Sequence, residues 1–266
     1  MFSKAEQQAL RAVAEEMADA AGAVTLRYFR QNTLQVDNKE SAGFDPVTIA
    51  DREAEQAMRA VLARHRPDDA IHGEEYGRKA GSTGLTWVLD PIDGTRAFIS
   101  GAPSWGVLIG LDAGQGPILG IIDQPFTGER FFGGFGKAGW VRGSEQRDIS
   151  VRKCAGLENA ILMTTFPELG SKAEGAAFAA VSAKCQLTRF SLDCYAYALL
   201  AMGQIDLVIE AGLNAYDAQG PIGVIEAAGG IVTDWQGGPA HHGGQIIAAG
   251  DLRTHAQALE ILNHKN

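Results

Sequence analysis

The first third of the chain carries the apolar periodicity of two amphipathic helices. From residue 4 to about residue 30, apolar side chains recur every three or four positions among acids and arginines, which places them on one helical face. The residues of this face are Ala9, Leu10, Val13, Met17, Ala20, Ala21, Val24 and Tyr28. A second helix is predicted from Thr48 to Arg64, because Asp45-Pro46 favours a turn before it and Pro67 follows its end.

The middle of the chain has the pattern of strands. The apolar run from Thr86 to Leu89 predicts a short buried strand that ends on Asp90, after a glycine- and serine-rich stretch from Gly77 to Gly84. Between Trp105 and Val141, four apolar segments follow one another with glycine between each pair, and we expect them to form an antiparallel meander. Their sequences are WGVLIGLD, GPILGIID, GERFFGG and AGWVRG.

Beyond Ser150, strands and helices alternate, which is typical of α/β proteins. The predicted elements are the strand ENAILMTT, the helix AEGAAFAAVSAK, the strand QLTRF, the helix CYAYALLAMG, the strand IDLVIEA, a helix from Tyr216 to Ala228, the strands GIVTDW and QIIAAG, and a last helix to Asn263. The predicted fold class is therefore α/β, with an α+β half over residues 1–143 and an α/β half over residues 144–266 that completes the site. No linker separates the halves, so we expect them to share an interface.

Composition and charge limit what such a protein can do. With 45% hydrophobic and 21% charged residues, the 266-residue chain has the composition of a globular protein. Its 23 Lys and Arg against 32 Asp and Glu give a net charge of −9, which argues against binding to nucleic acids or anionic membranes. If so acidic a protein binds a phosphate ester, a divalent cation is needed to offset the repulsion.

The cysteines and the N-terminal segment indicate a cytoplasmic protein. Cys154, Cys185 and Cys194 form no CxxC pair, so we expect neither a disulfide framework nor a thiolate zinc site. The N-terminal segment contains acids throughout and is typical of neither a signal peptide nor a membrane span. No other segment approaches about 20 uninterrupted apolar residues.

The strongest chemical signal is the motif Asp90-Pro91-Ile92-Asp93-Gly94-Thr95. Two carboxylates three positions apart at the end of a strand, with a carbonyl between them, are ligands that suit a hard cation. Gly94-Thr95 precedes a short predicted helix from Arg96 to Ser100, whose free N–H groups can hold a phosphate oxygen beside the metal. On its own, an Asp-x-x-Asp pair is more often a solvated turn.

Further acids lie at the ends of other predicted elements, and together with this motif they favour a metal site over a solvated turn. Glu74 and Glu75 follow a short apolar strand, Asp51 lies in the first turn of the second helix, and Asp217 lies at the start of a late helix. Each has an ordinary explanation when taken alone, since a helix-terminal Asp such as Asp217 is commonly an N-cap. Together, four acidic clusters at element ends are what a two- or three-metal oxygen site needs.

These motifs resemble the inositol monophosphatase superfamily of Mg²⁺-dependent, lithium-sensitive phosphatases. The resemblance covers nearly the whole chain and rests on DPVTIAD, GEE, WVLDPIDGTRAFISG and YDAQGPIGVIEAAGGIVTDWQG. It implies a layered αβαβα sandwich, a homodimer, and two or three Mg²⁺ ions, with Mn²⁺ as a possible substitute. The implied metal ligands are Glu74, Asp90, the carbonyl of Ile92, Asp93 and Asp217. Thr95, hydrogen-bonded to Asp51, is implied as the group that orients the attacking water.

Within that superfamily the chain is similar to the histidinol-phosphatase branch. The likeness rests on GEEYG, GIIDQPFTGER and DCYAYALLAMGQIDLVIEAGLNAYDAQ, although Ser191-Leu192 stands where a glycine-rich turn is expected. The implied reaction is hydrolysis of L-histidinol phosphate to L-histidinol and phosphate in histidine biosynthesis. Glu210 and Asp193 are candidates for binding the substrate's ammonium, although Glu210 can equally be a solvated acid at a strand end. The further substrate-binding candidates are Asp93, Gly94 and Thr95.

Several alternatives remain at this point. The chain can be an inositol-1-monophosphatase, a phosphatase with a broad range of small substrates, or an inactive relative that serves as a regulatory subunit. The intact ligand set argues against the inactive relative. For a phosphatase we expect direct attack by a water held near Glu74 and Thr95, because a divalent cation lowers the pKa of water and neutralises the phosphate. The GxGxxG stretch at residues 134–139 precedes Trp140-Val141 and is predicted to be a hairpin, not a dinucleotide-binding turn.

Overall fold

The computed structural model describes residues 2–31, 36–38 and 46–263. As far as Asp148 the elements are α1 (Lys4–Tyr28), β1 (Val36–Asn38), β2 (Pro46–Thr48), α2 (Ile49–His65), β3 (Ala70–Gly73), β4 (Gly77–Lys79), β5 (Thr86–Asp93), α3 (Thr95–Ser100), β6 (Gly106–Asp112), β7 (Pro117–Gln124), β8 (Glu129–Gly134), β9 (Lys137–Arg142) and β10 (Glu145–Asp148). Beyond it are η1 (Leu157–Asn159), β11 (Ile161–Thr164), α4 (Lys172–Ser182), β12 (Leu187–Phe190), α5 (Asp193–Ala201), β13 (Leu207–Asn214), α6 (Ala215–Ala227), β14 (Ile231–Thr233), β15 (Gly243–Ala249) and α7 (Leu252–Asn263). Asp45, predicted to precede the second helix, lies outside the described residues.

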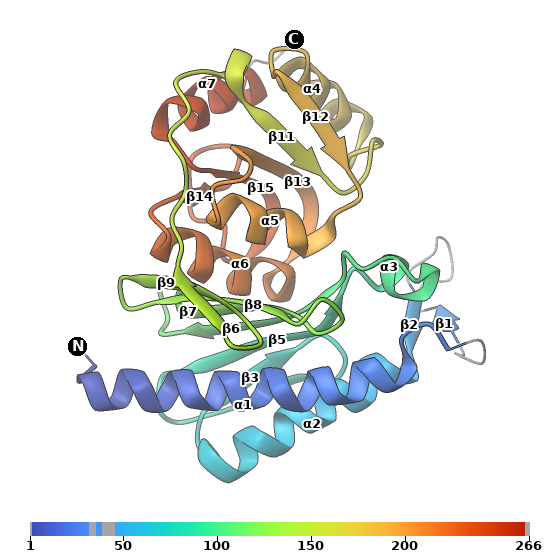
Figure 1. Cartoon of the computed structure of the whole chain (residues 1–266), viewed down its shortest axis with the longest axis vertical. Coiled ribbons are helices and arrows are strands. Elements are labelled where there is room, and N and C mark those ends of the chain that lie inside the picture. Colours follow the sequence, from blue (N-terminus) through green and yellow to red (C-terminus); the bar gives the residue numbers. More distant parts are fainter. Residues whose placement is uncertain (1, 32–35, 39–45, 264–266) are drawn as a thin grey trace.

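Five layers of helices and sheets alternate through the molecule (Figure 1). Helices α1 and α2 form one outer layer and cover an eight-stranded sheet, whose order is β10-β9-β8-β7-β6-β5-β3-β4. Helices α5 and α6 form the middle layer, and a five-stranded sheet of order β12-β11-β13-β15-β14 lies between them and the outer helices α4 and α7. The α/β class and the αβαβα sandwich are therefore both confirmed. Among the helices of the described ranges, none has the length and apolar composition of a transmembrane segment.

The apolar patterns predicted most elements, and the exceptions are short strands. The predicted meander is confirmed as β6 to β9, each strand antiparallel to the next, and the glycine-rich stretch at residues 134–139 is confirmed as the β8–β9 hairpin. Four strands were not predicted: β1 and β2 have three residues each, β4 is Gly-Arg-Lys, and β10 has four exposed residues. β1 and β2 form a two-stranded sheet, and β4 and β10 lie at the edges of the large sheet, where one partner strand suffices and little apolar surface is buried.

The first sheet extends through β10, and the second begins at β11. The change from one sheet to the other thus falls between Asp148 and Ile161. The domain boundary after residue 143 stays a prediction.

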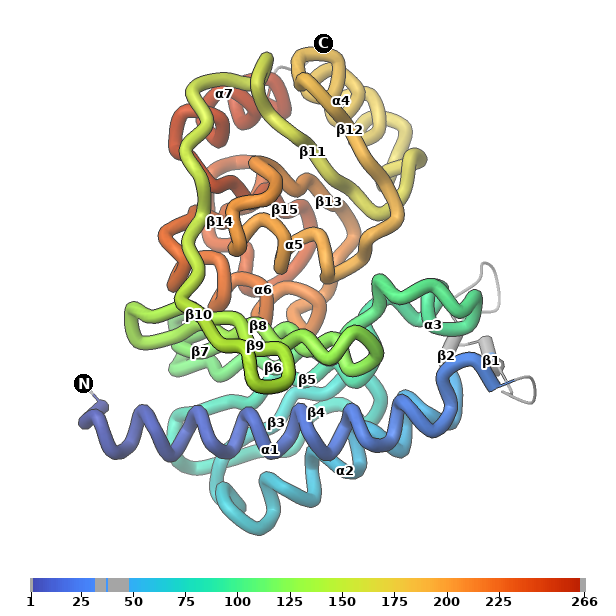
Figure 2. The backbone as a smooth tube through the Cα atoms, viewed as in Figure 1, coloured from blue at the N-terminus to red at the C-terminus, as the bar shows by residue number. Residues whose placement is uncertain are grey.

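Helix α6 packs backbone against backbone on the first sheet, directly over β6 to β8 (Figure 2). A Cβ at Gly120 of β7 would lie 2.1 Å from the carbonyl oxygen of Gly220 in α6, and one at Gly133 of β8 would lie 2.4 Å from that of Gly223. Glycine is required at these positions because any side chain would push the helix away from the sheet. This close approach holds the first turn of α6, which carries Asp217, near the end of β5.

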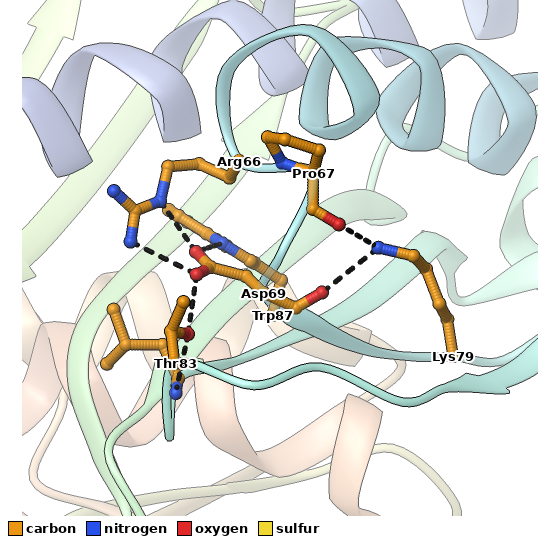
Figure 3. A network of polar contacts seen from close by, with 7 residues as sticks. Arg66, Pro67, Asp69, Lys79, Thr83 and Trp87 are labelled. Carbon is orange, nitrogen blue, oxygen red and sulfur yellow. Dashed lines mark hydrogen bonds and ion pairs between the residues drawn. The ribbon is translucent and has the colours of Figure 1, made fainter.

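A buried carboxylate fixes the connection from α2 to β3 (Figure 3). Asp69 is 1% exposed and accepts hydrogen bonds from Arg66 at 2.6 and 3.1 Å, from the Thr83 hydroxyl at 2.6 Å, and from the Trp87 indole at 2.9 Å. Burial raises the pKa of Asp69, but these hydrogen bonds outweigh burial and hold the pKa below its ordinary value. The network joins the end of α2 to β5, so the two elements that carry much of the site keep a fixed relation.

Candidate active site

The last residues of β5 direct two carboxylates to one point. In a regular strand, residues three positions apart face opposite sides of the sheet. The pairing of β5 with β6 is regular as far as Asp90, then shifts, and resumes at Asp93. Within the shift, Oδ1 of Asp90 accepts the backbone N–H of Ile92 at 3.0 Å. Gly94 then has a φ of 78°, in the left-handed region that favours glycine, and α3 begins at Thr95.

Asp217 completes a cluster with the two β5 carboxylates. Ligand oxygens of Asp90, Asp93 and Asp217 all lie within 4.8 Å of one another. Asp217 is the third residue of α6, and its Oδ2 accepts the backbone N–H of Asn214 at 2.6 Å, so it also caps the helix. The capping role considered from the sequence and a place in the cluster are therefore compatible.

The electrostatics of the cluster favour binding of a cation. Burial raises the pKa of Asp90 and of Asp93 well above the ordinary value, and neighbouring carboxylates raise both further. Among these carboxylates, Glu74 has the largest effect on the pKa of Asp90, and Asp217 has the largest effect on that of Asp93. A divalent metal relieves such repulsion, and carboxylate oxygen is the donor that Mg²⁺ and Mn²⁺ prefer. The donor set therefore fits the predicted metals.

Glu74 approaches the cluster from a neighbouring strand. It follows β3 directly, and its backbone N–H donates to the carbonyl of Leu89 in β5 at 3.1 Å. β3 runs parallel to β5, so both strands end at the same edge of the sheet. This arrangement places Glu74 beside Asp90, and it explains why acids at two separate strand ends share one site.

Thr95 connects the cluster to α2. Its Oγ1 lies 3.1 Å from the carbonyl oxygen of Ile92 and 3.4 Å from Oδ1 of Asp51, either of which can accept its proton. The other oxygen of Asp51 accepts the backbone N–H and the hydroxyl of Thr48 at 2.8 and 2.6 Å. Burial raises the pKa of Asp51 to about 6, although the Thr48 hydrogen bonds oppose this shift. The implied Thr95–Asp51 hydrogen bond is present in the structure.

A strained turn before α5 brings the second half of the chain to the cluster. Ser191 and Asp193 have φ values of 68° and 46°, a region that costs a non-glycine residue about 1–2 kcal/mol. The turn directs the backbone N–H of Cys194 to Oδ2 of Asp93 at 2.7 Å. It also fills the space over Gly94, where a Cβ would lie 2.8 Å from Cγ of Asp193. Non-glycine residues thus form the turn that the resemblance led us to expect as glycine-rich.

A cavity of about 300 Å³ opens onto the cluster. Its acidic lining residues are Glu74, Asp93, Glu168, Asp193, Glu210 and Asp217. Gly94 and Thr95 also line it, and among the lining residues Arg96 is the one base. Seven of the predicted site residues thus line one acidic cavity. The predicted ligands Asp90 and Ile92 are buried next to it and do not line it, and Asp51 contacts it through Thr95.

Glu210 is buried in β13 and is not a solvated strand-end acid. It is 4% exposed, and β13 continues to Asn214. Its Oε1 accepts both the backbone N–H and the hydroxyl of Thr165, at 2.6 and 2.9 Å. Burial raises the pKa of Glu210 to about 7, while the Thr165 hydrogen bonds lower it. The carboxyl therefore changes its charge near neutral pH.

Some lining residues were not predicted from the sequence. Thr165 holds Glu210, and Tyr197 lies buried in α5, where its hydroxyl has no hydrogen-bond partner among the residues that the structure describes. Phe166 and Tyr216 also line the cavity. A threonine at a strand end and a tyrosine on an apolar helix face are common features of a core, so only the positions of β13 and α5 in space identify them.

Comparison with known proteins identifies relatives over the whole length. The model of the inositol monophosphatase family matches residues 6–265. The bifunctional phosphatase IMPL2 of Arabidopsis thaliana chloroplasts is 44% identical over 98% of this chain and 77% of its own length. A histidinol-phosphatase of Chlorobaculum parvum is 34% identical over 85% of each chain. A solved inositol monophosphatase structure from Zymomonas mobilis is 40% identical, with a TM-score of 0.82 over 99% of this chain and 100% of that one.

Proposed function

The chain belongs to the inositol monophosphatase family, and from this premise we propose that it is a Mg²⁺-dependent phosphomonoesterase that hydrolyses L-histidinol phosphate to L-histidinol and phosphate. The observation that carries the choice of substrate is the excess of acids in the cavity. Asp193 and Glu210 line it in addition to Asp93 and Asp217 of the three-carboxylate cluster. Histidinol phosphate carries an ammonium group that can pair with such acids, whereas an inositol phosphate has only hydroxyl groups there.

The residues that would hold the metal are Glu74, Asp90, the carbonyl of Ile92, Asp93 and Asp217. We propose two or three Mg²⁺ ions, for which Mn²⁺ can substitute. When bound, these ions neutralise the phosphate dianion and lower the pKa of water, so that hydroxide is available near neutral pH. The raised pKa values of Asp90 and Asp93 support this assignment, because a cation removes the repulsion that raises them.

The remaining steps belong to the protein's own groups. When the Thr95 hydroxyl donates its proton to Asp51 or to the carbonyl of Ile92, its oxygen is free to accept a hydrogen bond from the attacking water. Glu74 accepts a hydrogen bond from the other O–H of that water, which aims the oxygen lone pair at phosphorus, and takes its proton as the new P–O bond forms. The bond from phosphorus to the ester oxygen breaks, and the leaving alkoxide takes up a proton from solvent to give the alcohol. Asp93, Gly94 and Thr95 position the phosphate group for in-line attack. No covalent phosphoenzyme is formed on this route.

Glu210 and Asp193 select the leaving group in this proposal. Asp193 is the first residue of α5 and Glu210 lies in β13, so both come from the second half of the chain, whereas Asp90 and Asp93 come from β5. Figure 1 shows α5 and β13 in different layers from β5. The Ser104 hydroxyl and the Thr165 hydroxyl fix the Asp193 and Glu210 carboxylates by donating to one oxygen of each. Fixed carboxylates bind an ammonium more strongly than mobile ones, since less side-chain entropy is lost on binding.

Replacing Glu210 by glutamine is expected to reduce discrimination between substrates. Loss of a charge-assisted hydrogen bond to the ammonium costs about 1.5–3 kcal/mol, which lowers kcat/KM for histidinol phosphate about 10- to 150-fold. The same variant should hydrolyse p-nitrophenyl phosphate nearly as well as the wild type, because that leaving group carries no ammonium. Glu226→Gln, at an exposed acid of α6 that does not line the cavity, is the control for loss of a negative charge and should change neither value.

The effect of this substitution should depend on pH. Below its pKa Glu210 is neutral and cannot pair with the ammonium, so wild type and Glu210→Gln should then behave alike. The ratio of the wild-type kcat/KM to that of Glu210→Gln, for histidinol phosphate, should therefore rise with pH. Its midpoint should lie at or below about pH 7, because burial raises the pKa of Glu210 to about 7 and bound cations lower that pKa. The substrate's own titrations cancel in this ratio. Equal losses on both substrates, or a ratio independent of pH, would mean that Glu210 serves the fold or the metals.

Three further properties belong to the same proposal. We infer a homodimer and inhibition by Li⁺ from the family resemblance. We infer a cytoplasmic location because Cys154, Cys185 and Cys194 are all free thiols.

A further inference from the structure

The turn that carries Glu74 is held by a side chain of α2. Between β3 and β4 the chain reverses over Glu74, Glu75 and Tyr76. The backbone N–H of Glu74 bonds to β5, but the next two N–H groups bond to the carboxylate of Glu55. Glu75 donates to Oε2 at 2.7 Å and Tyr76 donates to Oε1 at 3.3 Å. The side chain of Glu55 therefore replaces the backbone partners that a strand would have supplied.

The fit between Glu55 and this turn is close. The Glu55 side chain is completely buried, and a Cβ at Gly73 would lie only 2.1 Å from its Oε1. Glycine is required at position 73 because the carboxylate lies directly against the backbone. A residue of another type there would displace Glu55 from the turn.

Arg59, one helical turn further along α2, neutralises Glu55 and holds the far end of the same turn. Its Nε donates to Oε1 of Glu55 at 2.7 Å, and its Nη2 donates to the carbonyl of Gly77 at 2.6 Å. The side-chain amide of Gln56 donates to the Tyr76 hydroxyl at 2.6 Å. One face of α2 thus fixes the turn from both ends.

The same helix also holds Thr95. Asp51 lies one turn before Glu55, and its Oδ1 accepts from the Thr95 hydroxyl. Residues four positions apart lie on one face of a helix, so Asp51 and Glu55 act as two fixed points of a rigid element. The distance between Thr95 and the Glu74 turn is then set by α2 and not by the loops themselves.

We propose that Glu55 is a positioning residue that fixes the Glu74 carboxylate beside Asp90 for metal binding. This inference rests on the proposed function, since it concerns the metals of that site. Glu55 does not line the cavity, so it acts through the backbone of residues 74–76. Groups that orient metal ligands typically contribute 10- to 100-fold in metal affinity.

The test is calorimetric titration of Mg²⁺ into chelator-treated protein, which needs no substrate. Glu55→Gln keeps the volume but turns an amide toward the N–H groups of Glu75 and Tyr76, and it should weaken Mg²⁺ binding about 10- to 100-fold. Steady-state kinetics should show a matching rise in the Mg²⁺ concentration at half-maximal rate, with kcat largely restored at saturating Mg²⁺. Asp206→Asn is the matched control: it also converts a buried carboxylate paired with an arginine to its amide, but its partners Arg152 and Ile161 lie in the second half of the chain, away from α2 and the Glu74 turn. It should keep the wild-type affinity.

Unchanged Mg²⁺ affinity in Glu55→Gln overturns the inference, and so does an equal loss in Asp206→Asn, which would reflect general destabilisation. If circular dichroism shows that Glu55→Gln is unfolded, Arg59→Met decides the question. Its site is partly exposed, and it releases both Glu55 and the carbonyl of Gly77, so affinity should fall in the same direction. A folded Arg59→Met with wild-type affinity would then refute the inference. If the wild type itself binds no Mg²⁺, it is the proposed function that fails.

Discussion

Asp93→Asn is expected to lower kcat by about three orders of magnitude while the protein keeps its fold. Removing a ligand charge weakens transition-state stabilisation by several kcal/mol, and about 4 kcal/mol corresponds to a thousandfold. The fold should survive because asparagine has the same volume and its amide oxygen can still accept the N–H of Cys194, as Oδ2 of Asp93 does at 2.7 Å. The measurement is single-substrate kinetics at saturating Mg²⁺, with the melting temperature determined in parallel.

Removing one charge from the cluster should also relieve repulsion in the metal-free protein. We therefore expect the thermal stability of chelator-treated Asp93→Asn to equal or exceed that of the wild type, since burial and Asp217 both disfavour the Asp93 carboxylate. Asp112→Asn is a suitable control, because it removes an acid from the same sheet at the end of β6 opposite to Gly106, the residue that pairs with Asp93. A variant of Asp93 with near-normal turnover would show that this carboxylate holds no metal.

Complete chelation of divalent metal is expected to abolish phosphatase activity. The cavity presents six acids to a phosphate dianion, and without bound cations this field repels the substrate. Addition of excess EDTA should reduce the rate at least about a thousandfold, and Mg²⁺ should restore it. Mn²⁺ should also restore activity, because the donors are carboxylate oxygens, and Li⁺ should inhibit.

The chelated protein provides the control for this prediction. Its far-ultraviolet circular dichroism should match that of the metal-bound protein, because the layers are held by apolar packing and by glycine contacts such as Gly120 with Gly220. Loss of activity then reflects loss of the metals and not unfolding. Full activity in excess chelator would contradict a metal-dependent mechanism.

The fold could be predicted where the spacing of apolar residues indicates which face of a helix or strand is buried. The long helix α1 and the strands β6 to β9 have clear patterns because one face or both faces are buried. The edge strands β4 and β10 have none, since their residues stay largely exposed and only backbone pairing defines them. Asp93 was expected to lie beyond the strand, yet β5 continues to it through a shifted register that no local pattern reveals.

The candidate site could be predicted as far as its residues lie in local motifs. Asp90 and Asp93 share one motif, and a short strand before Glu74 signals its place at the sheet edge. The contribution of Glu55 could not be predicted, because an acid inside an amphipathic helix is usually solvated and its burial depends on the β3–β4 turn packing against it. The burial of Glu210 likewise depends on Thr165, 45 positions away in the chain.

Phosphate release in the presence of Mg²⁺ from histidinol phosphate and from inositol 1-phosphate, compared as kcat/KM under identical conditions, tests the central claim most directly. If Glu210 and Asp193 bind the ammonium of the leaving group, histidinol phosphate should be preferred by about 10-fold or more, as expected for one charge-assisted hydrogen bond. Equal values, or a preference for inositol 1-phosphate, would contradict the proposed substrate, and no release from either would contradict the phosphatase assignment itself.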